Sequence, residues 1–283
     1  MNKGQTNHLL GYPVDTRLLI INADDFGMCH SINEAIIRTL QEGLVRSTTL
    51  MVPCPWSLHA MHFLANRLDI PFGIHLTVIS DPVDYRWGPV TPRGKVPSLV
   101  DQAGYFYNFE AMPALLAQVK LDQLEMEFRA QIEAVLATGL KPTHLDWHAL
   151  RMGGRTDIFD LMFRLAREFG LALRVRGRPS IDKLQNQGFP TSDYDFLDSY
   201  GLDPSTKPAL YTQLLRELPA GLSEWAVHPG LDNGELLALE PADNHERQTD
   251  FEFWTSRLAK DIIKAEGIIL LDYRALQAVW RGM

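Results

Sequence analysis

Short apolar runs alternate along this chain with longer amphipathic segments, and this alternation constrains the fold more than any other feature. The first run, residues 17–25, is apolar until it breaks into acid, which is typical of a strand buried on both faces. Six further strands are predicted at residues 47–52, 72–78, 143–148, 171–176, 223–228 and 267–271. Helices are predicted at residues 31–43, 57–68, 109–139 with interruptions, 157–169, 205–218 and 246–265, and a last helix begins at residue 274. The spacing of Ser31 and Glu34 predicts a capping box at the first helix.

Alternating strand and helix units build a parallel sheet, which is either open and doubly wound or closed as a barrel. A length of 283 residues suits a barrel, for which about 250 residues is typical. We therefore expect an α/β fold with a single (β/α) barrel-like domain of about seven parallel strands. No change in composition marks a boundary, so residues 1–16 are predicted to be an N-terminal tail and residues 17–283 one domain. Two irregular regions, residues 80–108 and 177–204, are predicted to be loops.

Charge and cysteine content exclude several classes of protein. The chain has 27 basic and 35 acidic residues, a formal net charge of −8, which disfavours a nucleic-acid binder or a binder of anionic membranes. No stretch approaches the roughly 20 apolar residues of a membrane span, and residues 1–8 lack the apolar core of a signal peptide, so a cytoplasmic protein is expected. The only cysteines are Cys29 and Cys54, so carboxylates and histidines must hold any metal. His59 and His62 lack an acidic partner nearby and are predicted to be surface residues.

Ionisable side chains gather at the carboxyl ends of the predicted strands, where both open sheets and barrels place their active sites. Asp24 and Asp25 end the first strand, His75 lies late in the third, and His228 ends the sixth. Two adjacent aspartates are also common as a capping or turn pair. Because neighbouring residues of a strand point to opposite faces, these carboxylates share a site only where the strand becomes a loop.

The fourth predicted strand carries His144, Asp146 and His148 on one face, since they occupy positions i, i+2 and i+4. Burying three ionisable groups without partners is costly, which favours a functional role. A rise of about 3.3 Å per residue separates His144 and His148 by about 13 Å, too far for both to bind one ion. We therefore assign His148 as the ligand, Asp146 as a carboxylate of the site or its support, and His144 as a deeper hydrogen-bonding support.

One of the two aspartates, with His75 and His148, gives one carboxylate and two imidazoles, a ligand set that leaves positions open for water and substrate. His228 is a candidate general acid, because its ordinary pKa of about 6.5 suits proton donation near neutrality; as part of a His-Pro-Gly sequence it is equally a turn residue. Arg174 and Arg176 share a face of the fifth strand. Arg174 is a candidate for orienting a substrate or for pairing with a carboxylate of the fourth strand.

Four ordered motifs give the chain a family resemblance. They occupy residues 18–27, 43–49, 73–76 and 141–148, and the later His228-Pro229 and residues 266–269 also fit. Together they resemble the YdjC family of carbohydrate deacetylases, and the resemblance runs from residue 17 to the C-terminus. It implies a (β/α) barrel, a divalent cation and the removal of acetyl groups from N-acetylated sugars.

The resemblance also implies roles for individual residues. Asp25, His75 and His148 match the metal ligands of the family and Asp24 its catalytic base, a distinction that spacing alone leaves open. His228 matches the histidine of the family's late His-Pro motif. The expected ion is Mg²⁺ or Zn²⁺, the expected partner is a small carbohydrate substrate, and a homodimer is the assembly that the resemblance suggests.

One departure from the family concerns the substrate. In the family's chitooligosaccharide deacetylases the fourth-strand motif continues with a histidine-rich run, whereas residues 149–151 here are Ala-Leu-Arg, and Trp147 replaces a small residue. A chitooligosaccharide substrate is therefore not assumed. Trp87, Tyr105 and Tyr107 are candidates for stacking on sugar rings and equally for ordinary packing.

Two other functions stay open. The same metal centre suits an esterase or a phosphoesterase, although no basic pocket signature supports a phosphate substrate. A non-catalytic carbohydrate-binding barrel is the alternative from a different class, but such a protein has little need of Asp24 and His228 beside three metal ligands.

Overall fold

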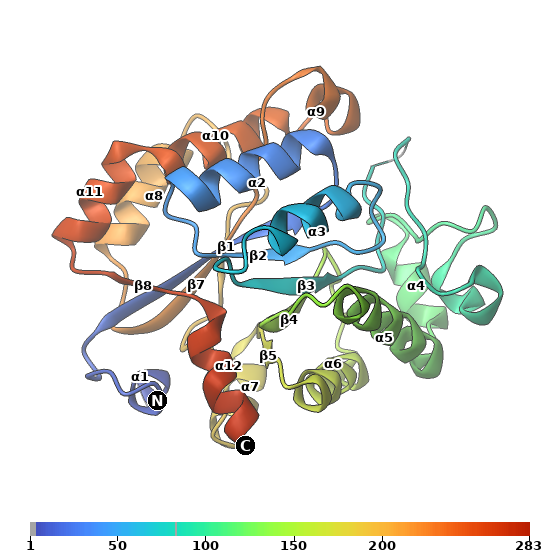
Figure 1. The fold of residues 1–283 in the computed structure, drawn as a ribbon, viewed down its shortest axis with the longest axis horizontal. Coiled ribbons are helices and arrows are strands. Elements are labelled where there is room, and N and C mark those ends of the chain that lie inside the picture. The colour runs from blue at the N-terminus through green and yellow to red at the C-terminus, as the bar shows by residue number, and fades with distance from the viewer. Residues whose placement is uncertain (1–3, 83) are drawn as a thin grey trace.

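A single parallel sheet of eight strands forms the frame of the protein within the residues that the structure describes, 4–82 and 84–283. The structure is a computed structural model, and its helices surround the sheet (Figure 1). The strands are β1 (Arg17–Phe26), β2 (Ser47–Leu50), β3 (Phe72–Leu76), β4 (His144–Trp147), β5 (Ala172–Leu173), β6 (Leu197–Asp198), β7 (Gly221–Val227) and β8 (Ile269–Leu271). Seven of them follow the order β5-β4-β3-β2-β1-β7-β6, and β8 pairs with the first half of β1.

Helices follow most of the strands. They are α1 (Gln5–Leu9), α2 (His30–Glu42), α3 (Ser57–Ala65), α4 (Met112–Gln118), α5 (Leu121–Ala137), α6 (Thr156–Phe169), α7 (Arg178–Gln185), α8 (Lys207–Arg216), α9 (Gly234–Leu239), α10 (Asn244–Thr255), α11 (Arg257–Ala265) and α12 (Tyr273–Gly282). Short 3₁₀ turns lie at Arg93–Lys95 and Pro97–Leu99. Across the described residues, none of the helices has the length and apolar character needed to cross a bilayer.

The sheet is strongly curled, as one buried side chain demonstrates. Arg174 follows β5, four places from β1 in the strand order, so a flat sheet would place it about 19 Å from β1. Its guanidinium nevertheless binds Asp24 of β1 at 2.6 Å and Glu224 of β7 at 2.7 Å. The sheet therefore wraps around its concave face, while β5 and β6 stay unpaired with each other in the described part of the chain. The predicted α/β fold of about seven parallel strands is confirmed, as a half-barrel.

The second irregular region is more ordered than predicted. Residues 177–204 were expected to form a loop, but they contain α7 and the short strand β6, which pairs with β7. The predicted fifth strand, residues 171–176, is reduced to the two residues of β5. Two-residue strands depend on tertiary pairing rather than on a period in the sequence, so a pattern search does not detect them.

The prediction of one continuous helix over residues 246–265 is wrong, because the structure has two helices there. The backbone of Ser256 is extended, and this residue separates α10 from α11. Its hydroxyl accepts a hydrogen bond from the amide of Ala259 at 3.1 Å, so it caps the second helix. Residues 250–260 contain neither glycine nor proline, so the sequence does not reveal the break.

The predicted capping box of the first long helix is also wrong. Helix α2 begins at His30, so Ser31 lies inside the helix rather than at its N-cap, and its hydroxyl donates to Glu235. The Glu235 carboxylate, from α9, accepts from the amides of His30 and Ser31 at 3.3 and 2.7 Å. A carboxylate distant in sequence therefore satisfies the free amides at this helix N-terminus.

The segment before β1 packs onto the domain. Residues 1–16 were predicted to be a tail, and residues 1–3 lie outside the described part. Thr6 is buried, and its hydroxyl donates to the carbonyl of Thr191 at 2.6 Å. The buried Asn7 amide donates to the carbonyls of Pro13 and Thr16 at 2.9 and 2.8 Å. These contacts fix the segment where β1 begins.

Candidate active site

An irregularity at the end of β1 lets its two aspartates face one cavity. The pairing of β1 with β2 shifts register between Ala23 and Phe26, and Asp25 adopts a left-handed backbone with φ of 70°. That conformation is uncommon for a residue other than glycine and interrupts the alternation of a regular strand. Asp24 and Asp25 consequently line the same cavity, of about 660 Å³, and both are at least 96% buried.

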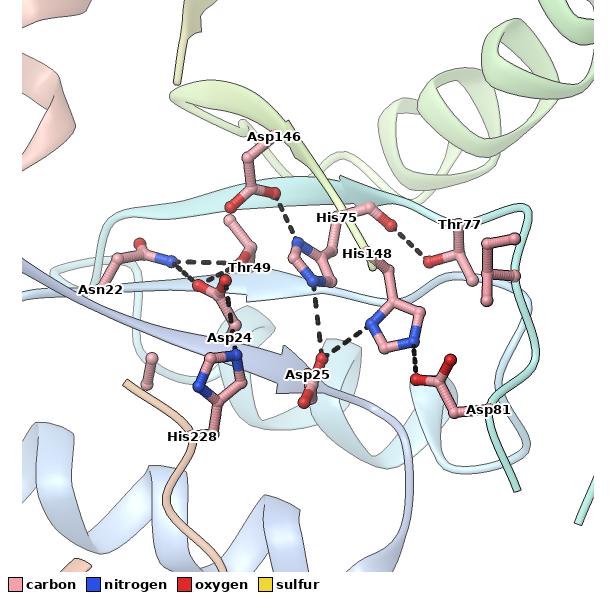
Figure 2. Close-up of polar contacts among 12 residues, drawn as sticks. Asn22, Asp24, Asp25, Thr49, His75, Thr77, Asp81, Asp146, His148 and His228 are labelled. Atoms are coloured by element: carbon pink, nitrogen blue, oxygen red, sulfur yellow. Dashed lines mark hydrogen bonds and ion pairs between the residues drawn. The ribbon is translucent and has the colours of Figure 1, made fainter. Parts of the chain in front are cut away.

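Asp25, His75 and His148 form a compact group of metal-ligand type (Figure 2). One ligand atom from each side chain lies within 4.8 Å of the other two, and all three residues are buried. Oδ1 of Asp25 is 3.0 Å from Nδ1 of His148 and 3.5 Å from Nε2 of His75. One carboxylate and two imidazoles at these separations suit a divalent ion such as Zn²⁺, with further positions left for water or substrate.

Each imidazole of this group uses its second nitrogen to bind a supporting carboxylate. Nδ1 of His75 donates to Asp146 at 2.7 Å, and Nε2 of His148 pairs with Asp81 at 2.6 Å. Metal-binding histidines typically have such partners, which fix the orientation of the ring and the ligating nitrogen. Asp146 was selected from the sequence, whereas Asp81 was missed because it lies in the predicted loop without any periodic signal.

The charges of the group also suit a cation. Burial disfavours protonation of both imidazoles, but Asp146 outweighs burial and raises the pKa of His75 to about 9, and Asp81 with Asp25 raises the pKa of His148 to about 10. Burial raises the pKa of Asp25, but Arg247 and the two imidazoles hold it well below its usual range. The acidic surroundings thus hold positive charge at the point where the three ligand atoms meet.

Arg247 is a residue of the site that sequence reasoning missed. It lies on α10, is 2% exposed, and donates from Nη2 to Oδ2 of Asp25 at 2.9 Å. Its other acidic partner is Glu240, which accepts from Nε at 2.5 Å. The arginine therefore holds the outer oxygen of Asp25, which leaves Oδ1 to face the two histidines.

Asp24 is held by a different arginine. Arg174 donates to both of its oxygens, at 2.6 Å to Oδ2 and 2.9 Å to Oδ1, and Oδ1 also accepts from Asn22 at 2.7 Å and Thr49 at 3.3 Å. Burial raises the pKa of Asp24, but Arg174 outweighs it and brings the pKa well below its usual range. Oδ2 has fewer donors and lies 4.0 Å from Nε2 of His228, so it is the oxygen left for a reacting group.

Arg174 is the centre of a buried charge cluster. Besides Asp24, it contacts Asp146 and Glu224, each at 2.7 Å. The guanidinium also lies 5.4 Å from the ring centroid of Phe196. The Arg174 guanidinium thus bridges carboxylates of β1, β4 and β7 on the concave face of the sheet, beneath the site.

His144 lies away from this group. Its ring stacks on Tyr273 with centroids 3.5 Å apart, and its Nδ1 is 2.9 Å from the hydroxyl of Thr143. Burial, with Arg174 nearby, lowers the pKa of His144 well below its usual range. A Cβ atom at Gly73 would lie 2.5 Å from this ring, so glycine makes room for it.

The aromatic residues around the cavity differ from those proposed in the sequence analysis. Phe109, Trp147, Phe196 and Tyr200 line it. Trp87 is 2% exposed, and its Nε1 donates to the carbonyl of Ile79 at 2.8 Å, so it packs inside the loop. Tyr105 lies against Arg86 and Arg93, and the hydroxyl of Tyr107 accepts from Gln118.

Two other groups of possible ligands are already satisfied within the protein. The first comprises Asp24, His75 and Asp146, where the Arg174 guanidinium takes the position of a cation. The second comprises His30, Glu34 and His59. His59 is partly exposed and lies near Glu34, so the prediction that it lacks an acidic neighbour is wrong, whereas His62 is exposed as predicted.

The neighbourhood of His59 explains why the second group does not suit a metal. Oδ1 of Asn33 accepts from the amide of Gly27 at 2.6 Å, and its Nδ2 donates to the carbonyl of Trp56. The amide orientation is therefore fixed, and Nδ2 faces Nδ1 of His59 at 3.1 Å. Nδ1 must accept this hydrogen bond, so the proton of the neutral ring lies on Nε2 and neither nitrogen is free to ligate.

Comparisons with known proteins identify the family of this chain and agree with its fold. A protein from Enterococcus faecalis named carbohydrate deacetylase is 31% identical over 272 residues, covering 93% of this chain and 99% of its own length. A protein from Yersinia enterocolitica named chitooligosaccharide deacetylase is 28% identical over 260 residues, covering 91% of this chain and 98% of its own length.

A solved structure extends the likeness to three dimensions. It is the crystal structure of an Enterococcus faecalis protein described as a candidate cellobiose-phosphate cleavage protein, and it superimposes with a TM-score of 0.78 at 29% identity. The match covers 92% of this chain and 99% of that protein. The family model described as YdjC-like protein matches residues 18–265, and the chain belongs to this family.

Proposed function

We propose that this chain is a metal-dependent carbohydrate deacetylase that hydrolyses the N-acetyl amide bond of sugars. The observation that carries the proposal is the convergence of a three-residue ligand group with two candidate proton-transfer residues. Asp25, His75 and His148 supply the ligand group, and Asp24 and His228 line the same cavity. The names of the YdjC-like relatives support the choice of an acetylated sugar as substrate.

Asp25, His75 and His148 would hold the cation, for which Zn²⁺ and Mg²⁺ are the main candidates. A divalent ion bound there supplies Lewis acidity to the amide carbonyl and makes water easier to deprotonate. Asp81 and Asp146 keep the two imidazoles oriented through their second nitrogens.

Asp24 is the proposed general base. Arg174 keeps it ionised, and Oδ2 is its oxygen with fewer competing donors, so Oδ2 accepts the proton of the attacking water. His228 lies 4.0 Å away and gives a proton to the departing amine nitrogen as the carbon–nitrogen bond breaks. Asp24 thus accepts a proton from the attacking water, and His228 gives a proton to the leaving group.

The direct test measures acetate release from N-acetylated mono- and disaccharides by protein loaded with Zn²⁺ or Mg²⁺. We expect Asp24→Asn to abolish turnover while metal content stays near that of the wild type. His148→Ala should lose both metal and activity. Full activity in Asp24→Asn contradicts the base assignment, and unchanged metal content in His148→Ala contradicts the ligand assignment.

A specific observation favours a second candidate, hydrolysis of a phosphate ester. No basic pocket signature is evident in the sequence, but Arg151 and Arg176 both line the cavity, and neither forms an ion pair within the described residues. Each lies against an aromatic ring, Arg151 over Phe109 and Arg176 over Phe196. The substrate panel therefore includes sugar phosphates, scored for both acetate and phosphate release, and sugar binding without either product favours a non-catalytic role.

A further inference from the structure

A buried hydrogen-bonded chain lies behind His228, on the side of the ring away from Asp24. Nδ1 of His228 is 2.9 Å from the hydroxyl of Ser199, and that hydroxyl donates to Oδ2 of Asp250 at 2.5 Å. Ser199 and Asp250 have no exposed surface. The three residues come from separate segments, the end of β7, the residue after β6 and helix α10, so the fold has to bring them together.

Asp250 receives hydrogen bonds on both of its oxygens. Oδ2 accepts from the backbone amide of His228 at 2.8 Å as well as from Ser199, and Oδ1 accepts from Nζ of Lys207 at 3.0 Å and from the hydroxyl of Tyr211 at 2.7 Å. The amide and the ammonium can only donate, so the Asp250 carboxylate acts as an acceptor throughout this network.

The direction of these bonds determines the protonation of the histidine ring. A hydroxyl has one proton, and that of Ser199 is committed to Asp250. The Ser199 oxygen must therefore accept from His228, which places a proton on Nδ1. In the neutral ring Nε2 is then unprotonated, and this nitrogen is the one that lies 4.0 Å from Oδ2 of Asp24.

We propose that Ser199 and Asp250 are positioning residues that hold His228 with Nδ1 protonated and Nε2 presented to the reacting amide. This inference rests on the function proposed above and deepens it, because it assigns the atom that exchanges the proton. Tyr200 packs against one side of the ring, with centroids 5.5 Å apart and the two planes inclined at 68°.

The proton balance of the reaction fits this arrangement. The oxygen of water bonds to the acetyl carbon, and one water proton passes to Asp24. This proton moves from Oδ2 of Asp24 to the unprotonated Nε2 of His228, 4.0 Å away, and from Nε2 to the amine nitrogen as the carbon–nitrogen bond breaks. Both groups are then restored, and the products are acetic acid and the free amine. Nδ1 of His228 keeps its proton, and its hydrogen bond to Ser199, throughout.

Long-range ¹H–¹⁵N NMR spectra of the ¹⁵N-labelled full chain test the proposal without requiring turnover. The signals of His228 are identified by their loss in His228→Gln. At a pH where the ring is neutral, the wild type should show the Nδ1–H tautomer, and Ser199→Ala should shift the ring toward the Nε2–H tautomer. Ser199→Thr keeps the hydroxyl and should keep the wild-type tautomer.

Kinetics provide the second measurement. We expect Ser199→Ala to lower kcat about tenfold with KM within about twofold, since one hydrogen bond that orients an acid–base group is lost. Ser192→Ala is the matched control, because Ser192 is also buried on this segment and its hydroxyl has no hydrogen-bond partner within the described residues. It should change neither tautomer nor kcat.

An Nε2–H tautomer in the wild type overturns the proposal, and so does an unchanged tautomer with unchanged kcat in Ser199→Ala. These results differ from a failure of the proposed function. A wild type that releases no acetate overturns the deacetylase assignment, while the NMR spectra still report whether Ser199 sets the tautomer. Ser199→Ala avoids the folding defect expected of Asp250→Asn, which would leave the buried Lys207 without its carboxylate.

Discussion

Replacing Arg174 by methionine tests how the charges beneath the site are balanced. The guanidinium contacts three buried carboxylates, Asp24 at 2.6 and 2.9 Å, Asp146 at 2.7 Å and Glu224 at 2.7 Å. Removing one partner of a buried ion pair costs about 3–5 kcal/mol, and here three carboxylates lose the same cation. We therefore expect Arg174→Met to lower the free energy of unfolding by at least about 3 kcal/mol at pH 8.

The loss of stability in Arg174→Met depends on pH, and the pKa of the Asp24 carboxylate determines whether the loss grows or shrinks as the pH rises. In the wild type burial raises its pKa, but Arg174 prevails and brings it well below the ordinary 3.8. The ion pair therefore stabilises the fold fully above pH 3.8, and this stabilisation is lost as the pH falls through the folded-state pKa. In Arg174→Met the group that most strongly opposes burial is lost, so the pKa of the carboxylate rises and its ionisation destabilises the fold. The difference between wild type and variant consequently grows from pH 5 to pH 8.

Urea denaturation at pH 5 and pH 8 measures this difference. Arg174→Lys is the matched variant, because it keeps a positive charge but loses the fork of donors, and it should lose less stability than Arg174→Met. Arg176→Met, at an exposed position of the same segment, should lose no more than about 0.5 kcal/mol. A loss below about 1 kcal/mol for Arg174→Met, or the same loss at both pH values, refutes the view that this guanidinium neutralises the buried carboxylates.

Three further predictions concern separate parts of the structure. Asp81→Asn should weaken Zn²⁺ binding about 10- to 100-fold by calorimetry, because Asp81 orients His148; an unchanged Kd contradicts this support. Gly73→Ala should lower stability in urea by about 1–3 kcal/mol, since its Cβ would overlap the His144 ring, and a neutral result would show that β3 can move aside. Ser256→Ala should cost about 1 kcal/mol in the same assay and Ser256→Asp much less, because α11 loses and then regains its cap; equal losses would argue against capping.

The gathering of polar residues could be predicted from the sequence because parallel strands bring their carboxyl ends to one edge of a sheet. Asp24, Asp25, His75, His148 and His228 all end or follow strands, and all line one cavity. The apolar runs that mark these strands are local features of the sequence, so the strand ends and the polar residues at them can be predicted from one sequence.

The residues that support this group could not be predicted in the same way. Asp81 lies in a long loop, and Arg247 and Asp250 lie on a helix whose amphipathic pattern gives no sign of which polar residues turn inward. Their positions depend on contacts with segments more than 20 residues away, such as the bond from Arg247 to Asp25 across 222 positions. Such pairs have no local period, and only the folded chain reveals them.

The two adjacent aspartates illustrate the same limit at the centre of the site. Their spacing indicates a shared site only if the strand breaks, and the left-handed backbone of Asp25 provides that break. Two carboxylates this close would repel each other strongly in a buried place unless each had its own cation. The fold provides two, since Arg174 binds Asp24 and Arg247 binds Asp25. Arg174 binds both oxygens of Asp24, and Oδ2, the one with fewer other donors, lies beside His228. Arg247 binds only Oδ2 of Asp25, and Oδ1 lies beside His75 and His148. The different roles of two identical side chains therefore follow from the different partners of their oxygens.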